Sequence, residues 1–171
     1  HFSKSFIEKL DQKIEPYHLP VSDDDVVDDI NEKLFKTIVF NHRTKTYKDF
    51  KNFILKVCDP LWEKRQDFKV WIPLLDLAQI KEVGDKTWKD RLDDNGGYID
   101  NTKHKNKVNY HNYLSQCSVG FSPKQKYNGW SVATTDGMMT GVPYVMFDAD
   151  YYHELNPTAD YFTGYDHAIE L

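Results

Sequence analysis

The chain has 171 residues, about the length of one domain, and 40% of its residues are hydrophobic and 15% aromatic. This composition is sufficient for a packed core. The formal net charge of −5 argues against a free-standing nucleic-acid-binding protein, so a site for an anionic ligand would have to gather its cations locally.

The first 32 residues read as a segment that precedes the main domain. Residues 3–14 predict an amphipathic helix, and residues 16–21 predict an extended stretch that contains two prolines. Ser22 can then cap a short helix that has three aspartates in its first turn. Carboxylates are stabilised at that end of a helix, so we favour this interpretation over a metal site.

A strand followed by a helix is predicted next. Residues 36–40 are strand formers that end in Asn41-His42-Arg43, and Lys48 follows Arg43 at a spacing of five. Asp59-Pro60 is expected to end or kink the helix after Lys48. Its apolar residues repeat at three and four positions and line one face: Phe50, Phe53, Ile54, Val57 and Leu61.

The middle of the chain is less regular. Residues 68–72 predict a second buried strand, and the polar stretch 76–106 holds a further short strand at Tyr98-Ile99. Tyr110 and Leu114 then mark the inner face of a helix.

The last third of the chain returns to strands and helices. Residues 118–121 predict a strand, and the polar loop 124–128 leads through Gly129 into a helix from about 131 to 140. The start of such a helix favours an anion, and phosphate is the usual one. A strand at 142–147 and a short helix at 151–155 follow, with a turn between them.

Strands that alternate with helices predict an α/β fold. Each strand is an uninterrupted apolar run, which is typical of a parallel sheet covered by helices on both faces, so we expect a Rossmann-like, doubly wound sheet. Ligands of such sheets bind beyond the carboxyl ends of the strands. Arg43 follows one strand and the loop 124–130 follows another, so we expect the two segments to meet at one edge.

Residues 128–143 read NGWSVATTDGMMTGVP and resemble a known donor site. The pattern E-G-F-G-x-x-x-x-E-A-M-x-x-G-x-P is typical of the C-terminal half of retaining glycosyltransferases of the GT-B type, the group 1 family, which have two Rossmann-like halves. The residues in register are Gly129, Met138, Gly141 and Pro143.

The same resemblance assigns roles to three substituted positions. Asp136 stands where the family has the second Glu, which holds the ribose hydroxyls of the donor. Asn128 replaces the first Glu and can hydrogen-bond a sugar without carrying charge. Trp130 replaces the Phe, and it either shapes the sugar pocket or packs in the core.

The family also places an Arg after the first strand of this half and a Lys five residues later, where they hold the donor diphosphate. Arg43 and Lys48 match in type and spacing. A guanidinium binds phosphate oxygens through paired hydrogen bonds, and an ammonium adds a mobile charge. The resemblance therefore implies that these two residues stabilise the leaving group.

Four further residues are candidates for donor binding. His42 precedes Arg43 and can reach the phosphates or the sugar, or it is simply a hydrogen-bonded histidine. Ser131 and Val132 are at the start of the predicted helix, where its free N–H groups lie. Tyr98 lies where the family's loop meets the base and can stack on it, although a structural Tyr is the alternative.

The resemblance implies a function for residues 33–171, which would be the donor-binding domain of a glycosyltransferase. Residues 1–32 would be the linker and remnant of an N-terminal half, which fits a chain that opens without Met and stops in an apparent helix. The donor would be a nucleotide-diphosphate sugar such as a UDP-sugar, transferred with retention, without metal or cofactor. The acceptor, a saccharide or less readily a nucleic acid, would be held mostly by that other half.

The rival interpretation is a Rossmann or flavodoxin-like domain that binds a phosphate ligand or a protein and catalyses nothing.

Three other patterns have ordinary explanations. The seven histidines show no spacing typical of zinc ligands, and the two cysteines read as buried thiols. The basic run 103–107 is a nucleic-acid patch or, as we favour, a solvated loop. No signal peptide or membrane span is recognised, so we expect a cytoplasmic protein.

Overall fold

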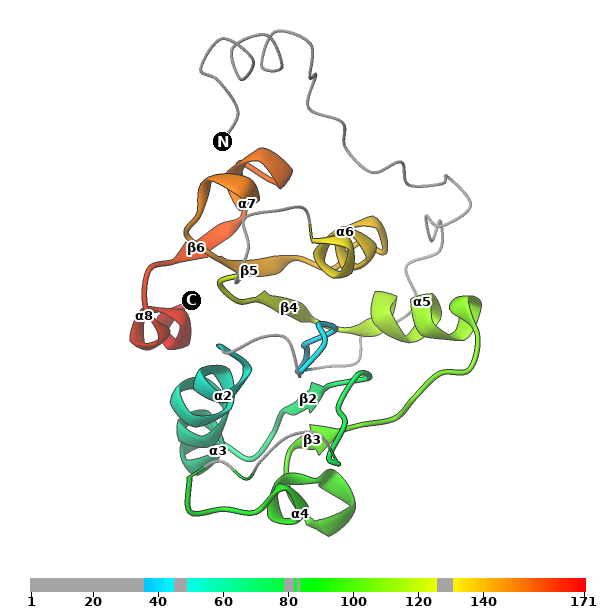
Figure 1. Cartoon of the computed structure of the whole chain (residues 1–171), viewed down its shortest axis with the longest axis vertical. Coiled ribbons are helices and arrows are strands. Elements are labelled where there is room, and N and C mark those ends of the chain that lie inside the picture. Colours follow the sequence, from blue (N-terminus) through cyan, green and yellow to red (C-terminus); the bar gives the residue numbers. More distant parts are fainter. Residues whose placement is uncertain (1–35, 45–48, 79–81, 83, 126–130) are drawn as a thin grey trace, which may run out of the picture.

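The computed structural model describes residues 36–44, 49–78, 82, 84–125 and 131–171, so the segments expected within residues 1–32 lie outside them. Strands and helices alternate along the described chain (Figure 1). In chain order they are β1 (Thr37–Val39), α2 (Asp49–Phe53), η2 (Ile54–Cys58), α3 (Asp59–Lys64), β2 (Lys69–Trp71), α4 (Trp88–Arg91), η3 (Asp93–Asn95), β3 (Ile99–Asp100), α5 (Lys107–Gln116), β4 (Val119–Ser122), α6 (Val132–Met139), β5 (Tyr144–Phe147), α7 (Asp150–Leu155), β6 (Asp160–Phe162) and α8 (Tyr165–Glu170).

The strands form one parallel sheet in the order β3-β2-β1-β4-β5-β6. This is the order of a doubly wound Rossmann-like fold, so the predicted fold class is confirmed. The order of the strands reverses between β1 and β4, which are direct neighbours with Ile38 opposite Val119. In open sheets of this kind, the crevice for a ligand lies at such a reversal, beyond the carboxyl ends of the strands.

Helices cover both faces of the sheet and enclose two hydrophobic cores. Figure 1 shows α2, α3 and α8 on one side of the sheet and α5 and α6 on the other. The first core contains Phe53 and Phe121, and the second contains Leu114. Successive strand residues face opposite cores, as Ile38 and Val39 do, because side chains alternate along a strand. Two-sided burial explains why these strands read as continuous apolar runs.

The helix after β1 continues past the position where we expected it to end or kink. Asp59-Pro60 does not end it, because helical backbone extends to Lys64. The hydrogen bonding instead widens to a π-helix over Ile54–Cys58, where the Asp59 N–H donates to the carbonyl of Ile54. A proline ring clashes with the carbonyl four residues earlier in an α-helix, and a wider turn relieves that clash.

Most other expected elements are present within a residue or two. The helix expected from about residue 131 is α6, and Ser131 caps it, since its side chain accepts a hydrogen bond from the Thr134 N–H. β6 was not expected, although it pairs with β5 over three residues. The strands predicted from sequence correspond to β1, β2, β3, β4 and β5, and the predicted helices to α2–α3, α5, α6 and α7.

Candidate functional site

The segment after β1 meets the first turn of α6 at the carboxyl edge of the sheet. Asn41, one residue beyond Phe40, is 2% exposed, and its amide nitrogen donates to the carbonyl of Ala133 at 2.7 Å. The same nitrogen donates to the Tyr110 hydroxyl at 3.1 Å, and the amide oxygen accepts from the Tyr144 hydroxyl at 3.1 Å. The end of β1 is therefore tied directly to the first turn of α6, about ninety positions away in sequence.

His42 lies beneath this edge, where it is 2% exposed. Its Nε2 is 3.5 Å from the Ser122 hydroxyl at the end of β4, and its ring packs edge-on against Phe40. Burial lowers the pKa of His42 from 6.5 to about 4, although a hydrogen bond with the backbone of Phe121 acts in the opposite direction. His42 is therefore a neutral imidazole at pH 7, and it contributes no positive charge to the edge.

A chain of buried hydroxyls continues from Ser122 to the start of α6. The Ser122 hydroxyl is 2.6 Å from that of Thr134, which in turn donates to the Ser131 hydroxyl at 2.8 Å. The Ser131 oxygen also accepts from the Thr134 N–H at 3.3 Å, which is the bond that caps the helix. The polar groups under α6 thus hold its first turn against the ends of β1 and β4.

The opening of α6 reaches the surface. Val132, its first residue, is 53% exposed, and the first intrahelical hydrogen bond runs from the Thr135 N–H to the Ser131 carbonyl. The N–H groups at the start of a helix precede that first bond and carry partial positive charge. Among the sequence candidates, Ser131 and Val132 therefore belong to one helix start, with His42 packed beneath it.

Arg43 is exposed and follows His42 directly at this edge. Asp136 lies one turn into α6 and is half-buried. Burial raises the pKa of Tyr110 to about 12, and the negative charge of Asp136 adds to that increase, so the carboxylate acts on the cluster around Asn41. The remaining candidates of this edge lie outside the described residues: Lys48, Asn128, Gly129 and Trp130.

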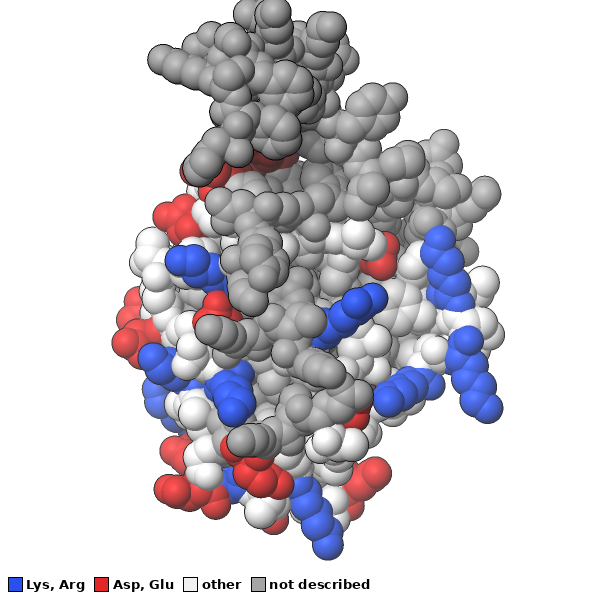
Figure 2. All heavy atoms as spheres, viewed as in Figure 1, with Lys and Arg blue, Asp and Glu red and all other residues white. Residues whose placement is uncertain are grey.

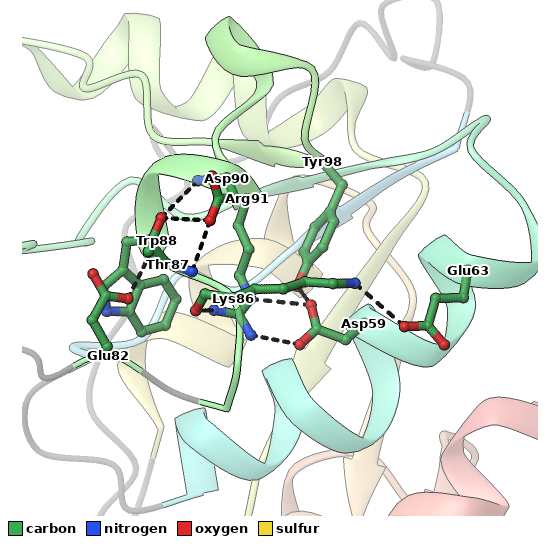
Figure 3. Close-up of polar contacts among 9 residues, drawn as sticks. All are labelled: Asp59, Glu63, Glu82, Lys86, Thr87, Trp88, Asp90, Arg91 and Tyr98. Atoms are coloured by element: carbon green, nitrogen blue, oxygen red, sulfur yellow. Dashed lines mark hydrogen bonds and ion pairs between the residues drawn. The ribbon is translucent and has the colours of Figure 1, made fainter.

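Tyr98 does not lie with the other candidates. It is 1% exposed, and its hydroxyl donates to Asp59 at 2.8 Å within a buried polar network (Figure 3). Arg91 binds the same carboxylate through two hydrogen bonds of 3.0 and 2.6 Å and also donates to the carbonyl of Lys86 at 2.6 Å. The ring therefore belongs to the core that joins β3 to the helix after β1, as in the structural alternative.

The charges of this network stabilise each other. Burial acts to raise the pKa of Asp59, but the hydrogen bonds from Arg91 and Tyr98 hold it below its usual value. Burial raises the pKa of the Tyr98 hydroxyl far above its usual range, so this group remains a donor. A buried ion pair that also has neutral hydrogen-bond donors is well compensated, which is the arrangement expected of a structural element.

A groove of about 400 Å³ lies at the opposite edge of the sheet. Thr37, Lys69 and Gly97, at or just before the starts of β1, β2 and β3, line it together with Trp62. Because it opens at the amino ends of the strands, it is separate from the edge that carries Asn41 and α6.

Figure 2 shows Lys and Arg side chains interspersed with Asp and Glu side chains on the face in view. Lys103 and Lys105, just before α5, and Lys107, its first residue, are exposed, which both interpretations of the run 103–107 require. In the part of the chain that the structure describes, no cluster of three His, Cys, Asp or Glu residues suits a metal, and no helix has the length and apolarity to cross a bilayer.

Sequence reasoning missed three residues of this edge, Asn41, Ser122 and Thr134. Asn41 was read only as part of the strand-end motif, although a polar residue directly after a buried strand is a reasonable candidate. Ser122 has the same signal at the end of β4. Thr134 follows Ser131 at the spacing of a capped helix start, a signal that could have indicated the cap but not the hydroxyl chain beneath it.

Comparisons with known proteins give little further information. No protein-family model matches the chain, and no curated protein is similar to it in sequence. Among solved structures, it is similar to the C-terminal CMP-Kdo binding domain of WaaA from Acinetobacter baumannii. The two share 9% identity with a TM-score of 0.46, over 82% of this chain and 79% of that one. A similarity this remote does not identify a function for the chain.

Proposed function

We propose that the chain is the donor-binding domain of a glycosyltransferase with two Rossmann-like halves. The observation that carries the proposal is the hydrogen bond of 2.7 Å between Asn41 and the carbonyl of Ala133, because it joins the two segments that resemble a donor site. Arg43 comes two residues after Asn41, and Val132, at the exposed start of α6, comes directly before Ala133. A cation and a helix start that converge at a strand-order reversal are suited to a diphosphate.

The chemistry in this proposal is electrostatic. As the bond from the sugar to phosphate breaks, negative charge grows on the departing diphosphate, and Arg43 and the N–H groups of α6 stabilise it. Loss of one such contact would raise the barrier by about 3 kcal/mol, or about a hundredfold in rate. His42 remains neutral at pH 7, so within the described part of this edge it acts as a hydrogen-bonding group and not as a counter-charge.

The donor, in this proposal, is a nucleotide-diphosphate sugar, and Asp136 holds its ribose hydroxyls. Transfer proceeds with retention of configuration, with the donor phosphate taking the acceptor proton, and it requires no metal. The acceptor is held mostly by an N-terminal half. The chain alone should therefore bind donor but turn it over very slowly.

Calorimetry with uridine, guanosine and adenosine diphosphates, and with their sugar derivatives, tests this function. One nucleoside diphosphate should bind, and Arg43→Ala should weaken it by about 10- to 100-fold, as expected for a charge-assisted contact. The matched control is Arg65→Ala, since Arg65 is exposed and paired with Asp67, which lines the groove at the amino ends of the strands. Absence of affinity for every nucleotide, or equal losses in the two variants, would refute the proposal.

A further inference from the structure

The ring of Tyr144 fills a slot that two glycines leave open. An added Cβ at Gly120 of β4 would lie 2.3 Å from the ring, and one at Gly137 of α6 would lie 2.1 Å from the hydroxyl. Any larger residue at either position would collide with the aromatic ring. α6 and β4 therefore approach Tyr144 as closely as backbone can, and its hydroxyl is held at a fixed place under the helix.

That hydroxyl sets the orientation of the Asn41 amide. It donates to the Asn41 oxygen at 3.1 Å, and burial raises its pKa well above 10, so it stays protonated as a donor. The amide nitrogen consequently faces the other way, where it reaches the carbonyl of Ala133 and the Tyr110 hydroxyl. Only an amide offers an acceptor to the phenol and two donors to these two oxygens from one short side chain.

Ala133 is in the first turn of α6, and Asn41 is two residues before Arg43. A hydrogen bond between them fixes the position of the helix start relative to the strand end. We propose that Asn41, oriented by Tyr144, is a positioning residue of the donor site, which sets the spacing between Arg43 and the N–H groups of α6. This inference rests on the proposed function, and it assigns a role to a side chain that need not touch the donor.

The variants Tyr144→Phe and Asn41→Ala test this role. Tyr144→Phe keeps the ring in its slot and removes only the hydroxyl, so it should fold even if Asn41→Ala does not. Tyr161→Phe is the matched control, because it also removes one hydroxyl donor from a tyrosine ring, and there the acceptors are the backbone carbonyls of Tyr152, at 3.0 Å, and Asn156. Affinities are measured by calorimetry for the nucleoside diphosphate that binds and by NMR titration for its parent nucleoside.

A positioning role predicts a selective loss. Tyr144→Phe should weaken binding of the diphosphate by about three- to tenfold, as expected for the loss of one hydrogen bond, and should leave the affinity for the nucleoside unchanged. Hydrogen exchange at the Thr135 amide, which makes the first intrahelical bond of α6, should be faster in Tyr144→Phe and unchanged in Tyr161→Phe. If Asn41 and Tyr144 had only a structural role, the affinities for both ligands would fall in proportion to the loss of stability.

The outcomes separate this inference from the proposed function. If the wild-type chain binds a diphosphate and Tyr144→Phe binds it equally well, the inference is overturned but the proposed function is not. Equal losses for diphosphate and nucleoside, or an equal loss in Tyr161→Phe, also overturn it. If the wild-type chain binds no nucleoside diphosphate, the proposed function is refuted and the role of Asn41 in it falls as well, whatever the exchange rate of α6.

Discussion

Acid should destabilise this protein through His42 well before its carboxylates are protonated. Burial lowers the pKa of His42 from 6.5 in the unfolded chain to about 4 in the folded one. A histidine with a depressed folded pKa contributes stability above its unfolded pKa, and this stability is lost as the pH falls towards the folded value. The window for the effect is therefore pH 6.5 to 4.

The size of the effect follows from the two pKa values. Linkage predicts that His42 lowers the free energy of unfolding by about 2 kcal/mol between pH 8 and pH 5, and by about 3 kcal/mol at pH 4. Most of the shift comes from desolvation of the ring beneath the carboxyl edge, where no described carboxylate is hydrogen-bonded to it. Its protonation would place a positive charge in a nonaqueous site next to Phe40.

Urea denaturation of the wild-type chain and of His42→Gln, from pH 8 to pH 4, measures this contribution. The variant should be less stable at neutral pH but should lose about 3 kcal/mol less on acidification. The control is His153→Gln, which replaces a histidine whose side chain is 45% exposed. Identical acid losses in all three proteins, or a His42 ring that titrates by NMR near pH 6.5, would refute the reasoning.

Two further predictions concern packing and the buried ion pair. Gly137→Ala should lower the free energy of unfolding by about 1–3 kcal/mol, because its Cβ would collide with Tyr144. This loss is expected despite the better helix propensity of Ala. Calorimetric melting should show that adding Tyr144→Leu partly restores the stability. Gly164→Ala is the control, since an added Cβ there meets nothing within 4 Å. Asp59→Ala should cost about 3–5 kcal/mol in urea denaturation, because the buried Arg91 loses its carboxylate, and a loss below about 1 kcal/mol would contradict a buried pair.

The fold could be predicted from sequence because its signals are local. The strand at 36–40 is a continuous run of strand formers because both faces of the sheet are buried, and the helix after it shows the three- and four-residue repeat through Phe53 and Val57. The helix from about residue 131 was equally readable, whereas the cap that Ser131 forms with Thr134 was not recognised from sequence. These elements alone predict a doubly wound sheet, and the structure has it.

What could not be predicted depends on contacts between distant residues. β6 contains Asp160 and is short, so neither its length nor its composition distinguishes it from a turn. The π-helix before Pro60 reflects how the chain accommodates one proline within a packed helix. Tyr98 carries no local sign that its hydroxyl binds Asp59, 39 positions earlier, so only the structure places it in the core.

The candidate edge shows the same division between topology and side-chain detail. Sequence reasoning predicted that the segments after β1 and around α6 would meet, because parallel strands end at one edge and ligands gather there. The link that joins them runs through Asn41 and Tyr144, which are 103 positions apart, and no pattern along the chain pairs them. Buried neutral groups thus hold the edge together, while the charge of Arg43 stays at the surface. Under the proposed function, an acidic chain would in this way present a cation to a phosphate without burying it, which avoids the large desolvation cost of an internal charge.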